Sequence, residues 1–498
     1  MTNKIAKIKK IENKIFRKNL SPLFRKIKNI INKNKIDNNF NLENISIDYL
    51  SKSKQGDIST NLLILIKNNL IEKDYQIEDF VFQEIKKFNY IKNIKISKNG
   101  FLNIFFHNDF IFNQLKEIFH NPSNYGKNNI GNKTKINIEF VSANPTGPIH
   151  IAHIRGAVLG DVLSSILENT GYDVTKEYYV NDAGSQISIL GESLFKRYLE
   201  LNGEKIFIND KDYPGEYLIE IAKKIFQKDG NKWINENSDK RKIFFKKFAV
   251  NEILENIKLD LSLIDIKFDK FTNESDIISQ KYIEKVFNLL KANNLLYEGI
   301  LDKPQGEDQV DWEPRKQLLF RSSNLLDDKD RPFKKSDGEW TYFANDSAYH
   351  YYKFERNFKK LINIWGADHI GYVNRMKSIA EVISNKKDFL SIKICQIVRL
   401  IKDDKFIKMS KREGNFITLK HIYDHIGRDA IRYFMISSKS ETPMDLDLKK
   451  VLEKNKDNPV FYCQYAYARA SSVINKSQSH NKFKNFINNI DQFNISSL

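Results

Sequence analysis

The sequence predicts an α/β fold built on a doubly wound parallel sheet, with a smaller α/β domain before it and a helical segment after it. Three observations lead to this architecture. A strand, a helix and a second strand follow one another from residue 136, and a charged helical stretch interrupts the pattern near residues 195–270. A segment rich in Gly, Pro, Ser and Asn separates roughly the first 120 residues from the rest. At 498 residues, several domains are expected.

The amino-terminal part has the pattern of helices followed by strands. Apolar residues in 5–36 have largely helical spacing, and residues 94–106 alternate as strands do. Residues 121–135 contain almost no large apolar side chain, which is typical of a linker. We therefore predict a separate α/β domain over residues 1–125.

The central part begins with a predicted β-α-β unit. Residues 136–141 and 174–180 are strand-like, and 151–169 carry helical apolar spacing. Gly171 stands where a left-handed residue would end that helix. A crossover of this length favours parallel strands with a right-handed connection. We predict a Rossmann-like domain over residues 135–450 with an insertion near 195–270, followed by helical residues 455–498.

The composition is that of a globular protein with a formal net charge of +18. This charge favours a polyanionic partner such as nucleic acid. The alternative is a drift in base composition, because Lys, Asn and Ile are abundant even in featureless stretches such as 29–39. Cys395 and Cys463 match no disulfide or zinc pattern, and no apolar run reaches the roughly 20 residues that span a bilayer. We expect a cytoplasmic protein without zinc.

The segment 138–161 runs from a strand through a Pro- and Gly-containing loop into a helix whose first turn holds His150 and His153. A helix amino terminus offers unpaired N–H groups and partial positive charge, and histidines there can donate hydrogen bonds to phosphate oxygens. A metal site is the alternative, but neither a third ligand nor the adjacent Glu of an H-E-x-x-H motif is found nearby. The pattern therefore favours phosphate binding.

A second basic motif, Lys408-Met409-Ser410-Lys411, lies far downstream and is followed by Gly414. Taken alone, it would be a solvated basic loop. Two lysines on either side of a hydroxyl could instead bring positive charge to departing phosphates.

Together the two motifs resemble the hallmarks of class I aminoacyl-tRNA synthetases. The longer segments resemble the arginyl members of that class over nearly the whole chain: SANPTGPIHIAHIRGAVLGD, EYYVNDAGSQI, TYFANDSAYH, GADHIGYVNRM and KMSKREGNFITL. Residues 56–61 and 100–103 resemble the family's amino-terminal domain, which contacts the tRNA elbow. Only residues 455–498 remain where the family has a full helical anticodon-binding domain, so that domain is expected to be incomplete.

The resemblance implies activation of L-arginine by ATP, then transfer of arginine to the 3′ end of tRNA(Arg) with release of AMP and pyrophosphate. ATP would enter as its Mg²⁺ complex, and no membrane partner is expected. The chain would act as a monomer. Two alternatives stay open: an RNA-binding relative impaired in catalysis by its short carboxyl end, and a nucleotidyltransferase that makes a small coenzyme.

Residue roles are carried over from the matching motifs. Catalysis is expected from His150, His153, Lys408 and Lys411. Arginine binding is expected from Glu139, Ser142, Asn144, Glu274, Tyr342 and Asp346. ATP binding is expected from Pro145, Gly147, His150, Ala152, His153, Gly366, Asp368, His369, Lys408, Met409, Ser410 and Lys411. Contacts with tRNA are expected from Gln464, Tyr465 and Arg469.

Several of these residues also have ordinary structural explanations. Asp346 could be a helix N-cap, and Tyr342 a buried aromatic residue of a strand. Glu139 could face solvent, and Ser142 and Asn144 could serve a turn. The tyrosines of 464–469 could pack in a core. Ala152 departs from the family, which usually has glycine between the two histidines, and the added methyl group is expected to weaken ATP binding at most.

Overall fold

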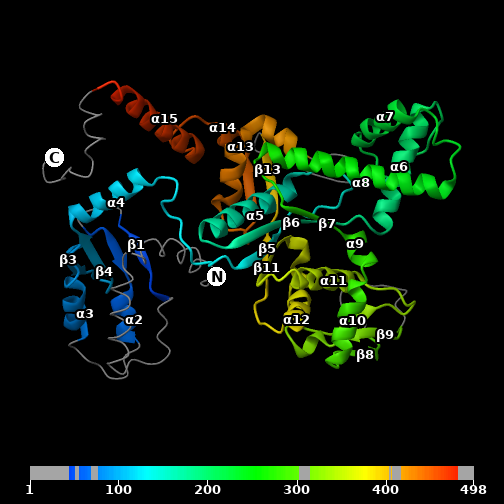
Figure 1. The fold of residues 1–498 in the computed structure, drawn as a ribbon. Coiled ribbons are helices and arrows are strands. Elements are labelled where there is room, and N and C mark those ends of the chain that lie inside the picture. Colours follow the sequence, from blue (N-terminus) through cyan, green and yellow to red (C-terminus); the bar gives the residue numbers. More distant parts are fainter. Residues whose placement is uncertain are drawn as a thin grey trace. The chain divides into compact units, whose positions relative to one another are not determined.

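The structure is a computed structural model that describes residues 44–50, 55–68, 77–301, 314–402, 405–406 and 417–480 (Figure 1). It divides into two compact units, Met1–Lys127 with Ser471–Leu498, and Asn128–Ala470. The helical stretch predicted over residues 5–36 lies outside the described residues. Each unit is described by itself.

The first unit contains a four-stranded antiparallel sheet in the order β1-β2-β4-β3. Its strands are β1 (Ile47–Tyr49), β2 (Ile58–Thr60), β3 (Ile91–Ile96) and β4 (Leu102–Phe106). Its helices are α2 (Leu62–Asn68), α3 (Ile77–Lys86) and α4 (Asn108–His120). The alternating stretch 94–106 thus divides between β3 and β4, which pair antiparallel. Alternate residues of β4 are buried, as expected for a sheet with one covered face.

The second unit is organised around a five-stranded sheet in the order β12-β11-β5-β6-β7, and every neighbouring pair in it is parallel. Its strands are β5 (Lys135–Glu139), β6 (Asp173–Val180), β7 (Lys270–Asn273), β11 (Lys360–Gly366) and β12 (Leu390–Cys395). The chain proceeds from β5 to β6 on one side, and β11 lies on the other. This reversal of strand order at β5 creates a crevice at the carboxyl ends of the strands, where ligands bind in open α/β sheets.

Helix α5 (Ile151–Asn169) connects β5 to β6, so the predicted β-α-β unit is confirmed. Thr170 caps the helix, and Gly171 follows with a φ of 85°. Gly160 lets α5 approach Phe140, because a Cβ atom at this position would lie 2.2 Å from the aromatic ring. Helices α6 (Ser185–Leu201), α7 (Tyr217–Asp229) and α8 (Ser238–Leu263) stand between β6 and β7. Figure 1 shows these three helices packed together beside the sheet.

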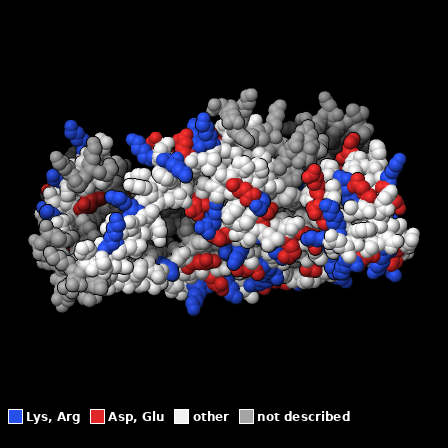
Figure 2. Space-filling model, turned by 90° about the horizontal axis from the view of Figure 1, so that it is seen from above, with Lys and Arg blue, Asp and Glu red and all other residues white. Residues whose placement is uncertain are grey.

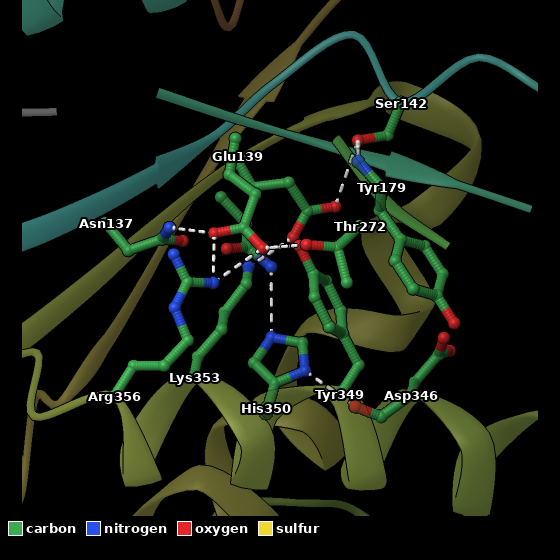
Figure 3. A network of polar contacts seen from close by, with 12 residues as sticks. Asn137, Glu139, Ser142, Tyr179, Thr272, Asp346, Tyr349, His350, Lys353 and Arg356 are labelled. Atoms are coloured by element: carbon green, nitrogen blue, oxygen red, sulfur yellow. Dashed lines mark hydrogen bonds and ion pairs between the residues drawn. The ribbon is translucent and has the colours of Figure 1, made fainter. Parts of the chain in front are cut away.

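A second hydrophobic core lies beneath a group of helices and a small antiparallel sheet that follow β7. The helices are α9 (Glu274–Ser279), α10 (Tyr282–Ala292), α11 (Tyr342–Glu355) and α12 (Val373–Ser384), with the 3-10 turns η3 (Ser322–Asn324) and η4 (Ala367–Tyr372). The strands are β8 (Leu296–Gly299), β9 (Gln317–Phe320) and β10 (Arg331–Lys334). Helix α11 crosses near the carboxyl ends of the parallel strands, where its polar side chains meet theirs (Figure 3).

The remaining elements begin with β13 (Val398–Lys402), which pairs antiparallel with β14 and parallel with β15. They are β14 (Lys405–Phe406), α13 (Leu419–Ser437), β15 (Met444–Asp447), α14 (Leu448–Leu452) and α15 (Pro459–Ser477). Helix α13 is interrupted at Gly427, whose φ of 75° is not helical. No described helix is long and apolar enough to cross a membrane.

Candidate active site

A buried ion pair joins the end of β5 to helix α11. Glu139 is the last residue of β5, and its Oε2 accepts a hydrogen bond from the Lys353 ammonium at 2.6 Å. Both side chains are buried, so the alternative that Glu139 faces solvent is wrong. The Ser142 hydroxyl donates to Oε1 of Glu139 at 3.2 Å and accepts the Tyr179 main-chain N–H at 3.0 Å. Ser142 thereby links the loop after β5 to β6.

A second carboxylate, Glu177 of β6, is fully buried and surrounded by donors. The Arg356 guanidinium donates to its two oxygens at 2.8 and 2.6 Å. Asn137 donates at 2.6 Å, Thr272 at 2.6 Å and Tyr349 at 3.2 Å. Burial opposes ionisation of Glu177, but the charges of Lys353 and Arg356 and the hydrogen bonds outweigh it, so its pKa is lowered. Glu177 is therefore a fixed anion beneath the crevice.

Asp346 lies on α11 with its carboxyl group directed toward the Tyr179 hydroxyl (Figure 3). Burial is the largest influence on this group, the neighbouring Tyr372 hydroxyl opposes it, and the charges of Glu274 and Glu139 add to it; its pKa rises to about 7. The N-cap alternative is wrong, because the Thr341 side chain caps α11 by accepting the Ala344 N–H. Asp346 thus holds its proton more tightly than an ordinary aspartic acid.

Tyr342 and Glu274 stand on two helices near Asp346. Tyr342 is the first residue of α11, one turn before Asp346, and is 74% exposed, so the alternative of a buried strand aromatic is wrong. Glu274 begins α9, is buried, and accepts a hydrogen bond from Asn345 at 3.0 Å. Burial raises its pKa, the Asn345 hydrogen bond lowers it, and the charge of Asp182 raises it; the net direction is upward.

His350 fastens α11 to the parallel sheet. Its Nδ1 lies 2.7 Å from the Asp346 carbonyl oxygen, and its Nε2 lies 3.0 Å from the Asn363 amide nitrogen. Burial, together with the charge of Lys353, lowers the pKa of His350 to about 3. The ring is therefore neutral at pH 7, donates from Nδ1 and accepts at Nε2.

The predicted phosphate-binding motif stands at the amino terminus of α5. His150 is the N-cap residue, its main-chain N–H donates to Nδ1 of His153 at 3.4 Å, and the two rings lie 4.0 Å apart. Residues 149–151 pair with residues 417–419, because the Ile151 N–H donates to Ile417 O and the Leu419 N–H to Ile149 O. Lys408, Met409, Ser410 and Lys411 lie outside the described residues.

The other residues expected to bind ATP lie along the loop after β5 and at the end of β11. Gly147 faces Tyr217, whose hydroxyl would lie 3.5 Å from an added Cβ atom. Pro145 is buried, whereas Ala152 is exposed on the first turn of α5. Gly366 ends β11, and Asp368 and His369 follow it in η4 with exposed side chains 3.5 Å apart.

Some predicted residues have contacts elsewhere. Asn144 is exposed and donates to Gln186 at 3.1 Å. On α15, Gln464 donates to Asp429 at 2.9 Å, and Tyr465 and Arg469 are exposed, which contradicts core packing for Tyr465. Gln464 lines a groove of about 720 Å³ among α8, α13, α14 and α15. Tyr465 and Arg469 follow it along α15.

The described side chains were also compared with the expectations for metal binding and for surface charge. No three of the described His, Cys, Asp and Glu side chains gather as metal ligands would. Cys395 and Cys463 are both free. On the face drawn in Figure 2, basic and acidic side chains are interspersed and form no single basic patch.

Sequence reasoning missed Asn137, Glu177, Tyr179, Lys353 and Arg356. Two of these carried a signal, because Asn137 and Glu177 are polar residues inside strands that a parallel sheet buries on both faces. Lys353 also carried one, since it follows Asp346 by seven residues and thus lies on the same face of a helix.

Comparisons with known proteins agree with this geometry. The model of the class I (R) tRNA synthetase catalytic domain matches residues 114–455, and that of the arginyl tRNA synthetase N-terminal domain matches 14–106. A putative arginyl tRNA synthetase structure from Campylobacter jejuni is 34% identical, with a TM-score of 0.65 over 74% of this chain and 78% of that one. The fold and the site define a class I aminoacyl-tRNA synthetase.

Curated relatives narrow the class. The arginine–tRNA ligase of Ehrlichia ruminantium (strain Gardel) is 40% identical over 433 residues, 87% of this chain and 75% of the relative. That of Orientia tsutsugamushi (strain Ikeda) is 43% identical over 426 residues, 85% and 72% of the two chains. The chain belongs to the arginyl-tRNA synthetase family.

Proposed function

We propose that the residues at the carboxyl ends of β5, β6 and β7, together with α11 and the start of α5, carry out the reaction of an arginine–tRNA ligase. In this reaction ATP activates L-arginine to arginyl-adenylate, and the arginyl group then passes to the 3′ end of tRNA(Arg). Pyrophosphate and AMP are released. The observation that carries the proposal is the surplus of carboxylates over cations beside the histidine-bearing helix.

The carboxylates suit a guanidinium group. Glu139 is already neutralised by Lys353 at 2.6 Å, whereas Glu274 is bonded to the neutral amide of Asn345. The raised pKa of Asp346 supports this assignment, because the neighbouring cations do not offset its burial and acidic neighbours. Asp346 and Glu274 would therefore hold the substrate cation, and Tyr342, Ser142 and Asn144 would line the pocket. A compact lysine ammonium cannot match this forked geometry.

The phosphate half of the reaction would use donors rather than a nucleophile. The arginine carboxylate attacks the α-phosphorus in line, a C–O–P linkage forms, and the bond to pyrophosphate breaks. His150 and His153 would donate to phosphate oxygens at the positive end of α5. Lys408 and Lys411 would neutralise the departing pyrophosphate, and Mg²⁺ would arrive on the phosphates of ATP. The remaining ATP contacts would be Pro145, Gly147, Ala152, Gly366, Asp368, His369, Met409 and Ser410.

The tRNA contacts are proposed for Gln464, Tyr465 and Arg469 of α15, where exposed aromatic and basic side chains could stack on and pair with nucleotides. We also propose domains over residues 1–125, 135–450 and 455–498, and a monomer. We also propose a cytoplasmic location. Charged tRNA is used in translation, and the two cysteines are free, as is usual in a reducing compartment.

The direct test incubates the protein with ATP, Mg²⁺ and labelled arginine, with and without cognate tRNA. We expect label on the RNA only when all components are present. Folded protein that binds tRNA but attaches no arginine would favour the inactive RNA-binding relative. Activity without tRNA toward a small phosphorylated acceptor would favour the small nucleotidyltransferase.

A further inference from the structure

Tyr179 lies in the crevice, and neither the histidine motif nor the KMSK motif gives it a role. It is the next-to-last residue of β6 and pairs with Thr272 of β7, so it lies at the carboxyl edge of the sheet. Its main-chain N–H is bound to the Ser142 hydroxyl, and its ring stacks on Tyr349 at 4.1 Å with an interplanar angle of 21°. Backbone and ring are thus held by separate contacts, which fixes the direction of the hydroxyl.

The Tyr179 hydroxyl is buried and has no hydrogen-bond partner among the described residues. Figure 3 shows it directed toward the carboxyl group of Asp346. Burial, followed by the charges of Glu274, Asp346, Glu139 and Asp182, raises the pKa of this hydroxyl well above its ordinary range. The group is therefore a neutral phenol among acidic side chains.

An unsatisfied buried hydroxyl is unfavourable in the empty protein, because the group has lost its hydrogen bonds to water. A bound guanidinium would remove this deficit. It brings five N–H donors, more than one carboxylate can accept. A tyrosine among carboxylates can donate its proton to one of them and offer its oxygen to an N–H group.

We propose that Tyr179 is a specificity-determining residue that accepts a hydrogen bond from the guanidinium of bound arginine while its own O–H donates to a pocket carboxylate. This inference rests on the proposed function, since it takes the crevice to be the arginine pocket. It explains a further element of selectivity. Citrulline, which matches arginine in shape, places a carbonyl oxygen where arginine has a nitrogen donor, so it cannot satisfy Tyr179 and the carboxylates together.

The test is Tyr179→Phe in the full-length protein. We expect KM for arginine to rise by about 10-fold to 100-fold, the range for losing a hydrogen bond to a charged group, with an unchanged KM for ATP. The Tm of the protein without arginine should stay the same or rise, because an unsatisfied hydroxyl has been removed. The increase in Tm on adding arginine should become smaller.

Tyr172→Phe is the matched control, because Tyr172 directly precedes the amino end of the same strand, at the opposite edge of the sheet from Tyr179. It should leave both KM values unchanged. An unchanged KM for arginine in Tyr179→Phe would overturn the proposal, and so would a lower Tm with both KM values raised, since that pattern indicates a structural role. Failure of the wild-type protein to charge tRNA would instead refute the proposed function, independently of Tyr179.

Discussion

Two guanidinium groups of the second unit are held in opposite ways. Arg356 donates to both oxygens of the Glu177 carboxylate. Arg155 of α5 is 1% exposed, and the described residues hold it by four neutral oxygens and no carboxylate. These are the carbonyl oxygens of Gln396 at 3.2 Å, Thr442 at 2.7 Å and Lys439 at 2.8 Å, and the hydroxyl of Ser438 at 2.9 Å.

The difference shows that a guanidinium built into the fold and the guanidinium of a substrate that binds and leaves are stabilised by different partners. We call the first the permanent cation and the second the passing cation. Neutral oxygens suffice for Arg155, because they belong to chain segments that fold around it; burial nevertheless lowers its pKa. A substrate guanidinium loses its hydration when it binds, and the preformed pocket has to compensate this loss of free energy. Carboxylates do so best, because they offer both opposite charge and hydrogen-bond acceptors. Arg356 and Lys353 use the charge of Glu177 and Glu139, and the acids left for a ligand are Asp346 and Glu274.

The largest effect is expected where the permanent cation is removed. Arg155→Met should remove the four hydrogen bonds by which the buried guanidinium holds these segments and lower the free energy of unfolding by about 3–5 kcal/mol. Denaturant unfolding would measure the loss. Arg428→Met is the matched control, because Arg428 forms an exposed pair with Asp265 and should change stability by less than about 1 kcal/mol. Equal effects of the two substitutions would contradict a structural role for the Arg155 contacts.

A smaller effect is expected in the pocket for the passing cation. Asp346→Asn should lower kcat/KM for arginine by about 100-fold or more, because one charged partner of the guanidinium is lost, while tRNA binding is retained. Aminoacylation assays and a filter-binding assay would separate the two. Asp337→Asn, in the exposed turn before α11, serves as the control. If tRNA binding fell as far as arginine use, Asp346 would not belong to an arginine pocket.

Asp346 also predicts a pH dependence. Its pKa of about 7 in the empty pocket lies above the ordinary 3.8, so below pH 7 arginine has to displace a proton. Arginine affinity should rise about tenfold per pH unit up to pH 7 and then level off. Calorimetric titration would measure it, and Asp346→Asn should flatten the profile. Without arginine, the stability contributed by protonated Asp346 should be full below about pH 4 and be lost as the pH rises through 7.

The smallest effect is expected at Ala152. Its side chain is exposed on the first turn of α5, so Ala152→Gly should be silent or lower KM for ATP by about twofold at most. Steady-state kinetics with varied ATP would measure this change. A large loss of activity would mean that the methyl group has a role of its own.

Much of the fold followed from local pattern, and much of the site did not. The β5-α5-β6 unit was predictable because apolar spacing and Gly171 are local signals. The partners of Glu139 and Glu177 were not, since Lys353 and Arg356 lie 214 and 179 residues away in sequence. The N-cap explanation for Asp346 was wrong because Thr341, five residues earlier, is the N-cap of the helix. Motif resemblance brought Asp346 and Glu274 to attention, but periodicity along α11 would also have pointed to Lys353.

The pairing of residues 149–151 with residues 417–419 has a consequence for mutational mapping. Two main-chain hydrogen bonds join the histidine motif to the residues that follow the KMSK motif. Alanine scanning would be blind to this tie, because every amino acid except proline supplies the same N–H groups. Only proline at residue 151 or 419 would delete one of these two hydrogen bonds. The link between the two motifs is therefore expected to tolerate almost any other substitution at these positions.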